Sequence, residues 1–418
     1  MMKKLIVLLT LLSLSSGLCM SQESFTIAVR NRSGIGIERH PVVLSWEYGN
    51  RAIKIEHGGV EVPYQLDDLN GDGVADELCF LTDLKGNERR DFSVRFVAAD
   101  SVCHYASEVY AEMLLKNPKI KEENKQDLYI SSLTVKKGTN PYWQLHHHGP
   151  AFENRLVGYR IFFDHRQTVD IYGKYHKGLE LKETQFYPDS VQKSRGYGDD
   201  VLWVGSTLGL GTLRGWNGSE PVMLDDVMER TLSIVASGPL RTIVEVEDRG
   251  WNAPRSESVS DSSRITMTTR YTLYAGRRDC MVDISFDREV GDYEFCTGMI
   301  NVKNSMEWSD HSGLRGCWGT DWPVSAKDSV GHKRETVGLG ICIPSEHVIS
   351  EKPKDKRNYA FVVGTKGSEL HYGITFCSAN ESFGFHSAEE WFAYLRTWKK
   401  VLGAHVETTV RNCSSLPH

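Results

Sequence analysis

The chain has 418 residues, of which 25% are charged, and a formal net charge of −6 at pH 7. This mildly acidic balance, with charges of both signs scattered along the chain, disfavours nucleic acid and anionic membrane surfaces as partners. Because single hydrophobic cores stop growing at roughly 250 to 300 residues, the length predicts one large core or two domains.

Residues 1–21 have the pattern of an export signal. Two lysines precede the apolar run Leu5 to Leu12, and small and polar residues follow up to Ser21. Cys19 raises a lipid anchor as the less favoured alternative, because the residue before a lipidated cysteine should be small and here it is leucine. No later stretch approaches the ~20 apolar residues of a membrane span. The predicted location is therefore periplasmic.

Residues 22–100 are predicted to form a β region that packs on the main domain. Short runs rich in β-branched and aromatic residues, bounded by turn residues, predict the strands, which are Phe25 to Val29, Val42 to Trp46, Ala52 to Ile55 and Phe92 to Val97.

A stretch rich in Asp and Gly inside this region matches the start of a calcium loop. Its oxygen ligands alternate along the chain and a glycine allows the sharp turn; the candidate ligands are Asp68, Asn70, Asp72 and Asp76. The twelfth position is Cys79, where a bidentate Glu is expected. The alternative interpretation is a turn between two strands, Val62 to Leu66 and Glu77 to Leu81.

Residues 101–140 are predicted to be a connector. Ala106 to Asn117 resembles a helix, and the charged stretch Lys116 to Asp127 is most simply solvated.

Residues 141–418 are predicted to form the main domain, a large antiparallel β-sandwich with a few short helices. Alternating or β-branched runs give its strands, among them Thr231 to Ala236, Arg241 to Glu247, Arg264 to Tyr274, Met281 to Asp287, Val337 to Ile343, Tyr359 to Gly364 and His371 to Phe376. One helix near the end has a capping box from Ser387 to Glu390 and stops at Gly403. Its Trp391 and Trp398 are expected in the core.

The stretch from Asn140 to Tyr175 concentrates proton-handling and anion-binding side chains. Two strands, Tyr159 to Phe163 and Thr168 to Tyr172, are predicted around a polar turn. If Ile161 points into the core, Arg160 points away from it; the other register buries Arg160, which then needs a paired anion.

This mixture suits the removal of a proton next to a carboxylate, with loss of an oxygen from the adjacent carbon. Such a site needs a cation, a base near neutral pH and an acid for the leaving oxygen. We expect one of His146, His147 and His148 to be the base and Arg160 to hold the carboxylate. Tyr175 or another histidine would be the acid, and Lys174 would polarise the enolate or the leaving oxygen.

Further side chains are candidates for substrate binding because they are aromatic or charged and lie near turns. They are Trp143, Glu153, Asp164, Arg214, Trp216 and His311. His146 and His148, with Glu153 as a third ligand, are an alternative zinc site. The run Gly205 to Gly211 lacks the ending of a phosphate-binding P-loop and is read as a glycine-rich turn near a ligand. Eight cysteines follow the signal without metal-ligand spacing, and both disulfides and buried thiols fit them.

Several motifs together resemble one exported bacterial family, catalogued as domain of unknown function 4861. The segments that carry the resemblance are 62–78, His148 to Arg160, Asp170 to Lys174 and Trp203 to Gly211. The family is common in gut and marine polysaccharide degraders, and the resemblance covers nearly the whole mature chain. It implies a β-sandwich of the broad kind shared with sugar mutarotases and several lyases. Some relatives are oligosaccharide dehydratases that act on the non-reducing-end uronic acid of ulvan-type fragments and leave a 4,5-unsaturated sugar. The resemblance assigns no catalytic residue.

The predicted function is therefore that of a carbon–oxygen lyase that acts by β-elimination on an acidic oligosaccharide, with no cofactor needed for the chemistry. Two alternatives stay open. A glycoside hydrolase would pair Glu153 with Asp164 or Asp199 across a cleft. A carbohydrate-binding protein would use aromatic platforms, namely Tyr142, Trp143, Trp216, Trp318 and Trp322.

Overall fold

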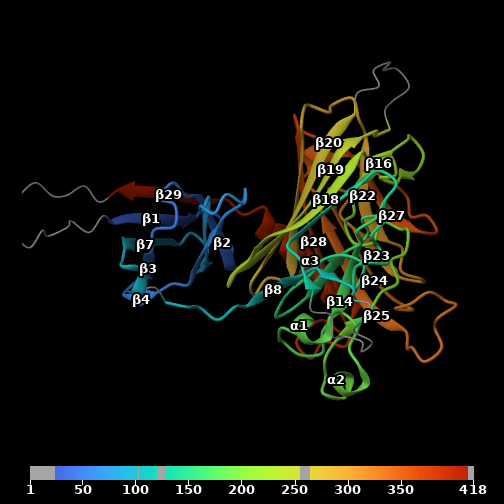
Figure 1. The fold of residues 1–418 in the computed structure, drawn as a ribbon, viewed down its shortest axis with the longest axis horizontal. Coiled ribbons are helices and arrows are strands. Elements are labelled where there is room, and N and C mark those ends of the chain that lie inside the picture. Colours follow the sequence, from blue (N-terminus) through green and yellow to red (C-terminus); the bar gives the residue numbers. More distant parts are fainter. Residues whose placement is uncertain (1–23, 102, 118, 120–127, 255–263, 413–418) are drawn as a thin grey trace, which may run out of the picture.

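The computed structural model describes residues 24–101, 103–117, 119, 128–254 and 264–412. The predicted export signal, with Cys19, and Cys413 lie outside these residues. Figure 1 shows a small group of strands, blue with one red strand, beside a larger body that holds the rest of the chain. The mainly antiparallel β fold with a few short helices is confirmed. The exact domain boundaries stay a prediction.

The small group consists of two antiparallel sheets. Five strands form one sheet in the order β29 (Val406–Asn412), β1 (Ser24–Asn31), β7 (Arg89–Phe96), β3 (Ile53–His57) and β4 (Val60–Glu61). Three strands form the other, in the order β2 (Ile37–Ser45), β6 (Glu77–Leu84) and β5 (Tyr64–Asp67). Alternate side chains of β7 are buried and join a core with residues of β1, β3 and β6. This is the period of two that half-buried strands require.

The last strand of the structure returns to the first. β29 pairs along the whole of β1, from Asn412 opposite Phe25 to Val406 opposite Asn31. The sequence pattern did not predict it, because β29 is an edge strand of mostly exposed polar residues and lacks an apolar alternation.

The larger body is built on a nine-stranded antiparallel sheet. Its order is β11 (Ser132–Lys136), β18 (Glu229–Ser237), β19 (Arg241–Trp251), β20 (Ile265–Tyr274), β21 (Asp279–Phe286), β28 (Glu369–Ser378), β25 (Glu335–Cys342), β24 (Leu314–Asp321) and β23 (Met306–Ser309). The predicted strands of this region are confirmed.

Two five-stranded sheets supply further strands to the same core. One has the order β15 (Asp199–Asp200), β14 (Val169–Gly173), β13 (Gly158–Ile161), β12 (Ala151–Asn154) and β8 (Val109–Glu112). The other has the order β17 (Pro221–Val222), β16 (Arg214–Trp216), β22 (Phe295–Ile300), β27 (Asn358–Val363) and β26 (Val348–Glu351). One hydrophobic cluster joins residues of all three sheets. A short ladder pairs β9 (Leu114–Leu115) with β10 (Leu128–Tyr129).

The helices are short except for the last. They are α1 (Leu181–Thr184), α2 (Ser190–Ser194), α3 (Ala388–Leu402) and two 3₁₀ turns, η1 (Ala99–Ser101) and η2 (Ser345–His347). The side chain of Ser387 accepts a hydrogen bond from the Glu390 N–H, and Gly403 ends α3, as predicted. Trp391 and Trp398 are buried against the large sheet. Within the described part of the chain, no helix is both long and apolar enough to cross a membrane.

One prediction about local structure is wrong. Ala106 to Asn117 contains the strands β8 and β9 instead of a helix, because its apolar residues are buried by sheet pairing with β12 and β10. The segment with Arg315 and Trp318 is the strand β24. Each described cysteine carries a free thiol, and all are buried except Cys103.

Candidate functional site

Arg160 is the centre of a buried polar cluster at one end of the five-stranded sheet that ends in β15. The pairing of β13 with β14 sets it opposite Asp170. Its Nε and Nη2 atoms donate to Oδ2 of Asp170 at 3.1 and 2.6 Å, and Nη2 also donates to Oδ2 of Asp200 at 2.7 Å. The register that buries Arg160 is therefore the one found, with two anions as partners. The expected bidentate grip on a substrate carboxylate is not what the structure shows, since Asp170 occupies that edge.

Aromatic rings cover the guanidinium and give it one more partner. Nη1 donates to the hydroxyl of Tyr187 at 2.6 Å, and the guanidinium carbon lies 4.1 Å from the centre of the Phe186 ring. Gln185 and Phe186 have φ values of 46° and 72°, a region that costs non-glycine residues free energy. This strained turn after α1 directs the Tyr187 hydroxyl onto Arg160.

The surroundings of the two carboxyl groups on Arg160 favour their protonated form. Burial raises the pKa of Asp170, and the charge of Arg160 opposes that rise only in part. Burial and the facing Asp170 carboxyl hold the pKa of Asp200 well above its usual range. One guanidinium cannot balance two buried carboxylates, so the fold favours a proton on the pair.

The three histidines lie in the chain between β9 and β12. Gly149, which follows them directly, lets this segment pack closely against β13. A Cβ atom on Gly149 would lie 1.8 Å from the carbonyl oxygen of Ile161. His147 bonds through Nε2 to Oε1 of Glu112 at 3.1 Å. His148 has a φ of 67° and stacks on Tyr142 with ring centres 3.8 Å apart.

Two ring nitrogens in this group lack partners. Nε2 of His146 and Nδ1 of His147 are shielded and accept or donate no hydrogen bond to any described residue. The ring of His146 lies edge-on to Tyr187, with centres 6.0 Å apart. Buried polar atoms are paired in most native proteins, and exceptions concentrate where chemistry occurs. His146 and Tyr187 therefore connect the histidines to the Arg160 cluster.

Burial keeps these imidazoles neutral. It lowers the pKa of His146 and of His147 to about 3 each, and that of His148 to about 4. Burial also raises the pKa of Glu112 to about 8. The hydrogen bond between His147 and Glu112 accordingly joins two neutral groups at neutral pH.

A pH-dependent stability follows from His147. Its folded pKa lies below the unfolded value of about 6.5, so the unfolded state binds more protons and stability falls as pH drops below about 6.5. For His147→Gln, we expect the stability deficit against the wild type to shrink by about 1 kcal/mol between pH 7 and pH 5.5. Denaturant unfolding at the two pH values measures it, with the exposed His405→Gln as control. A pH-independent deficit would show that His147 titrates normally.

Lys174 and Glu153 do not join this cluster. Both side chains are fully buried, and Nζ of Lys174 donates to Glu153 and to the carbonyl of Asn154 at 2.7 Å. The other Glu153 oxygen accepts the N–H groups of Glu180 and Leu181, each at 2.7 Å. The predicted convergence of Lys174 with the imidazoles is wrong, because this pair is sealed inside the fold. Glu153 is for the same reason unavailable as a zinc ligand or as one of two carboxylates across a cleft.

The remaining predicted site residues are scattered. The indole of Trp143 is 71% exposed and packs edge-on against Tyr142, beside the histidines. Tyr175 lies at the surface, and its carbonyl accepts hydrogen bonds from Ser382. His311 is exposed and bonds to Glu351 at 3.2 Å. Trp216 is buried in a small apolar cluster instead of forming a platform.

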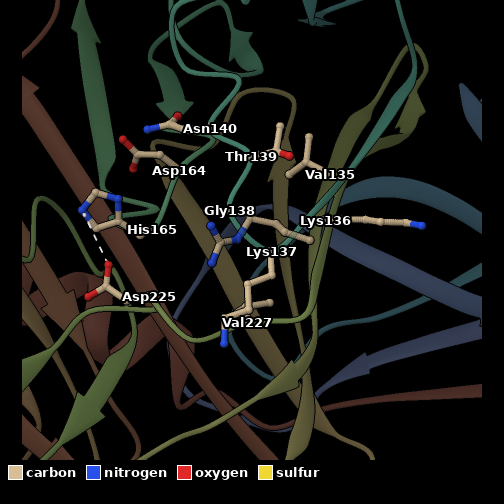
Figure 2. A pocket seen from close by; sticks show the side chains of 11 residues that line it. Val135, Lys136, Lys137, Gly138, Thr139, Asn140, Asp164, His165, Asp225 and Val227 are labelled. Atoms are coloured by element: carbon tan, nitrogen blue, oxygen red, sulfur yellow. Dashed lines mark ion pairs between the residues drawn. The ribbon is translucent and has the colours of Figure 1, made fainter.

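Asp164 lines a pocket of about 210 Å³ beside His165 and Asp225. Figure 2 shows the His165 ring and the Asp225 carboxylate facing each other, with Lys136 extending away. Nε2 of His165 and Oδ1 of Asp225 lie 3.9 Å apart. Asp164 itself is tied to Arg166 through an ion pair of 2.6 Å, so it serves the β13–β14 turn and does not face Glu153.

The Asp68 loop is a tight turn between β5 and β6. Asp68 accepts the N–H groups of Gly71 and Gly73, each at 2.7 Å, and Asp76 accepts that of Leu69 at 2.7 Å. The side-chain oxygens of Asn70 and Asp72 likewise accept hydrogen bonds from N–H groups within the loop. Across the residues that the structure covers, no three His, Cys, Asp or Glu side chains gather as metal ligands. Calcium at this loop stays a prediction, for which thermal stability with and without a chelator is the test.

Comparison with known proteins assigns most of the chain to one family. Residues 29–407 match the model of a family described as a domain of unknown function, DUF4861. The chain belongs to this family. The search among curated proteins found no match.

Two solved structures are similar to this DUF4861 chain. One is described as a protein in the glycosyl hydrolase family 38 from Enterococcus faecalis, with 10% identity and a TM-score of 0.48 over 92% of this chain and 47% of that one. The other is described as an alpha-mannosidase from Enterococcus faecalis V583, with 11% identity and a TM-score of 0.46 over 93% and 46%. The DUF4861 chain spans about half the length of these structures.

Reasoning from sequence missed three members of the cluster in this DUF4861 protein, namely Glu112, Tyr187 and Asp200. Glu112 was assigned to a helix, and Tyr187 follows a short helix with no motif. The doubled acid Asp199-Asp200 was a usable signal, since it ends a loop that leads back to the strand beside Arg160.

Proposed function

We propose that this protein is a carbohydrate-active enzyme that eliminates water from a uronic acid at the non-reducing end of an oligosaccharide, using the Arg160 cluster. The reaction breaks the C5–H bond and the C4–O bond and forms the C4–C5 double bond. It requires a group that takes the proton from C5 and a group that gives one to the departing hydroxyl.

His146 is the proposed base. Its imidazole is neutral at pH 7 because burial lowers its pKa to about 3, and Nε2 has no hydrogen-bond partner among the described residues, so in the tautomer with the proton on Nδ1 its lone pair is available. This nitrogen is shielded, so the sugar must displace a neighbour to reach it. Tyr187, which packs against His146 and is 36% exposed, is placed to move aside.

The Asp170–Asp200 pair is the proposed acid. In this proposal the pair retains a proton. Asp200 is the member nearer the surface, because its side chain is 15% exposed. After that proton passes to the leaving hydroxyl, Arg160 stabilises the carboxylates that remain. After the product leaves, His146 loses its proton to solvent and the carboxyl pair regains one from solvent, which closes the cycle without a net change in the protein.

An acidic sugar would also find a cation and an aromatic platform here. Lys116 is exposed and makes no ion pair with any described residue. Its ammonium group lies 5.8 Å from the centre of the Trp143 ring. The observation that carries the proposal is that His146, whose Nε2 has no partner among the described residues, packs against Tyr187, and that Tyr187 in turn contacts the Arg160 cluster with its two buried carboxyl groups.

The direct test is incubation of purified protein with uronic-acid oligosaccharides while absorbance is followed at ~235 nm, where a conjugated product of elimination absorbs. We expect absorbance to rise without new reducing ends. His146→Gln should slow the rise by about 100-fold, and the exposed His405→Gln should leave it unchanged.

Other outcomes assign other functions. New reducing ends without absorbance would indicate hydrolysis, and binding without turnover would indicate a carbohydrate-binding module. Full activity of His146→Gln would reject His146 as the base.

A further inference from the structure

Arg214 is a buried cation that has no carboxylate partner among the described residues. It is 1% exposed and starts β16. Its guanidinium donates to the carbonyls of Arg166 at 2.9 Å and Thr207 at 2.8 Å and to the hydroxyl of Thr168 at 3.0 Å, all neutral acceptors. Its Nε has no acceptor among the described residues. Burial is the main reason that the pKa of Arg214 falls to about 10.

This environment is unlike that of the other buried arginines. Each of them pairs with a carboxylate at 3.0 Å or less, and they are Arg160, Arg230, Arg241, Arg278 and Arg315. Burying an ion without a counter-ion is costly because the lost hydration is not replaced by an opposite charge. A counter-ion from solution would remove that cost.

The side chain of Arg214 lines a pocket of about 300 Å³ that carries two further cations. Lys356 and Arg357 come from the turn before β27, and both are exposed. Arg357 donates to the carbonyl of Ser206 at 2.7 Å, and Arg214 donates to the same oxygen at 3.3 Å. In the part of the chain that the structure covers, none of the three cations forms an ion pair. Two guanidinium groups thus meet at one neutral oxygen.

We propose that this pocket is a second binding site, one that holds a tetrahedral oxyanion, sulfate or phosphate, either free or as an ester on a saccharide. The volume exceeds that of such an ion, so it leaves room for part of a sugar. The exposed Arg357 has planar N–H donors that can match two oxyanion oxygens at once, whereas Arg214 contributes its uncompensated charge, because its Nη atoms already donate to protein acceptors. The site is separate from the proposed elimination chemistry and does not depend on it.

Two carboxylates on the pocket wall set limits on the ligand. Oδ1 of Asp355 accepts the N–H groups of Arg357 and Asn358 at 2.6 and 2.7 Å, which shapes the basic turn. Glu220 is exposed at the rim, where it opposes an anion. Glu220→Gln is therefore expected to tighten anion binding.

Calorimetric titration of the full protein with sodium sulfate, sodium phosphate and a monosaccharide sulfate tests the site. Sodium chloride and the unsulfated sugar are the references, at constant low ionic strength. We expect binding of the oxyanions, at least tenfold weaker in the double variant Lys356→Gln/Arg357→Gln and tighter in Glu220→Gln. Tighter binding of the sugar sulfate than of free sulfate would identify the ester as the ligand.

The matched control is Lys333→Gln/Arg334→Gln, an exposed Lys-Arg pair in another loop. It should bind like the wild type. Equal weakening in both double variants, or no oxyanion binding by the wild type, would overturn the proposal. Because both variants change exposed residues, unfolding is not expected to obscure the result. Both double variants should keep wild-type activity on an unsulfated uronic acid. That result would show that the anion site is independent of the elimination chemistry.

Discussion

Replacing Lys174 with methionine is expected to destabilise the protein by about 3 to 5 kcal/mol. The change leaves the Glu153 carboxylate buried with its cation gone, and it removes the donor from the carbonyls of Asn154 and Gly178. Breaking one side of a buried ion pair is costly because the remaining charge has neither water nor a partner. Denaturant unfolding at pH 7 measures the loss.

The double variant Lys174→Met/Glu153→Gln should recover at least ~1 kcal/mol of that loss. A glutamine oxygen still accepts the N–H groups of Glu180 and Leu181, while the isolated charge is gone. Lys137→Met is the control, since Lys137 pairs with Asp226 at the surface and exposed pairs contribute ~1 kcal/mol or less. An unchanged stability together with lost turnover would restore Lys174 to the catalytic role that the sequence predicted.

Lys174 shows why the candidate site was only partly predictable. The polar residues of the cluster do come mainly from the stretch that the sequence singled out. The strand pair around Arg160 was predictable because its side chains alternate with a period of two. Whether a polar residue faces a ligand or a partner inside the fold depends on segments far along the chain. Glu153 lies 21 residues before Lys174, and the partners of Glu153 come from the start of α1.

The fold was more predictable than the site. The strands of the large sheet carry β-branched runs, and α3 has both a cap and an apolar stripe, so local pattern and tertiary burial agree. The prediction is wrong where the local sequence pattern and the tertiary burial disagree. Val109–Glu112 alternates weakly and is buried by β12, and β29 has almost no apolar residues because it completes an edge.

The contribution of Arg160 to stability could not be predicted from the sequence. If Arg160 only held substrate, its replacement would abolish turnover at a nearly unchanged melting temperature. In the structure, Arg160 donates hydrogen bonds to both Asp170 and Asp200 inside the protein, so its removal disturbs folding and activity together. Arg160 variants therefore cannot separate the two roles, and a neighbour that keeps the cluster neutral is a better probe.

Asp200→Asn is that probe, and it should lower kcat on uronic-acid oligosaccharides by about 10²- to 10⁴-fold. A carboxamide has nearly the shape of the protonated carboxyl and can still accept the Arg160 hydrogen bond, but it cannot release a proton. Stability should change by ~1 kcal/mol or less, because the raised pKa of Asp200 means that little charge is lost.

The neighbouring Asp199→Asn is the matched control for this measurement. Asp199 is partly exposed and pairs with Lys193 on the surface, so its replacement should leave kcat nearly unchanged. Rates and unfolding free energies of both variants, measured on the same preparation, decide the assignment. If Asp199→Asn lost activity and Asp200→Asn kept it, the carboxylate at 199 would carry the chemistry instead. If both kept it, the proton held between Asp170 and Asp200 would serve the fold alone, because a cluster that supplies the leaving hydroxyl with a proton cannot work without one.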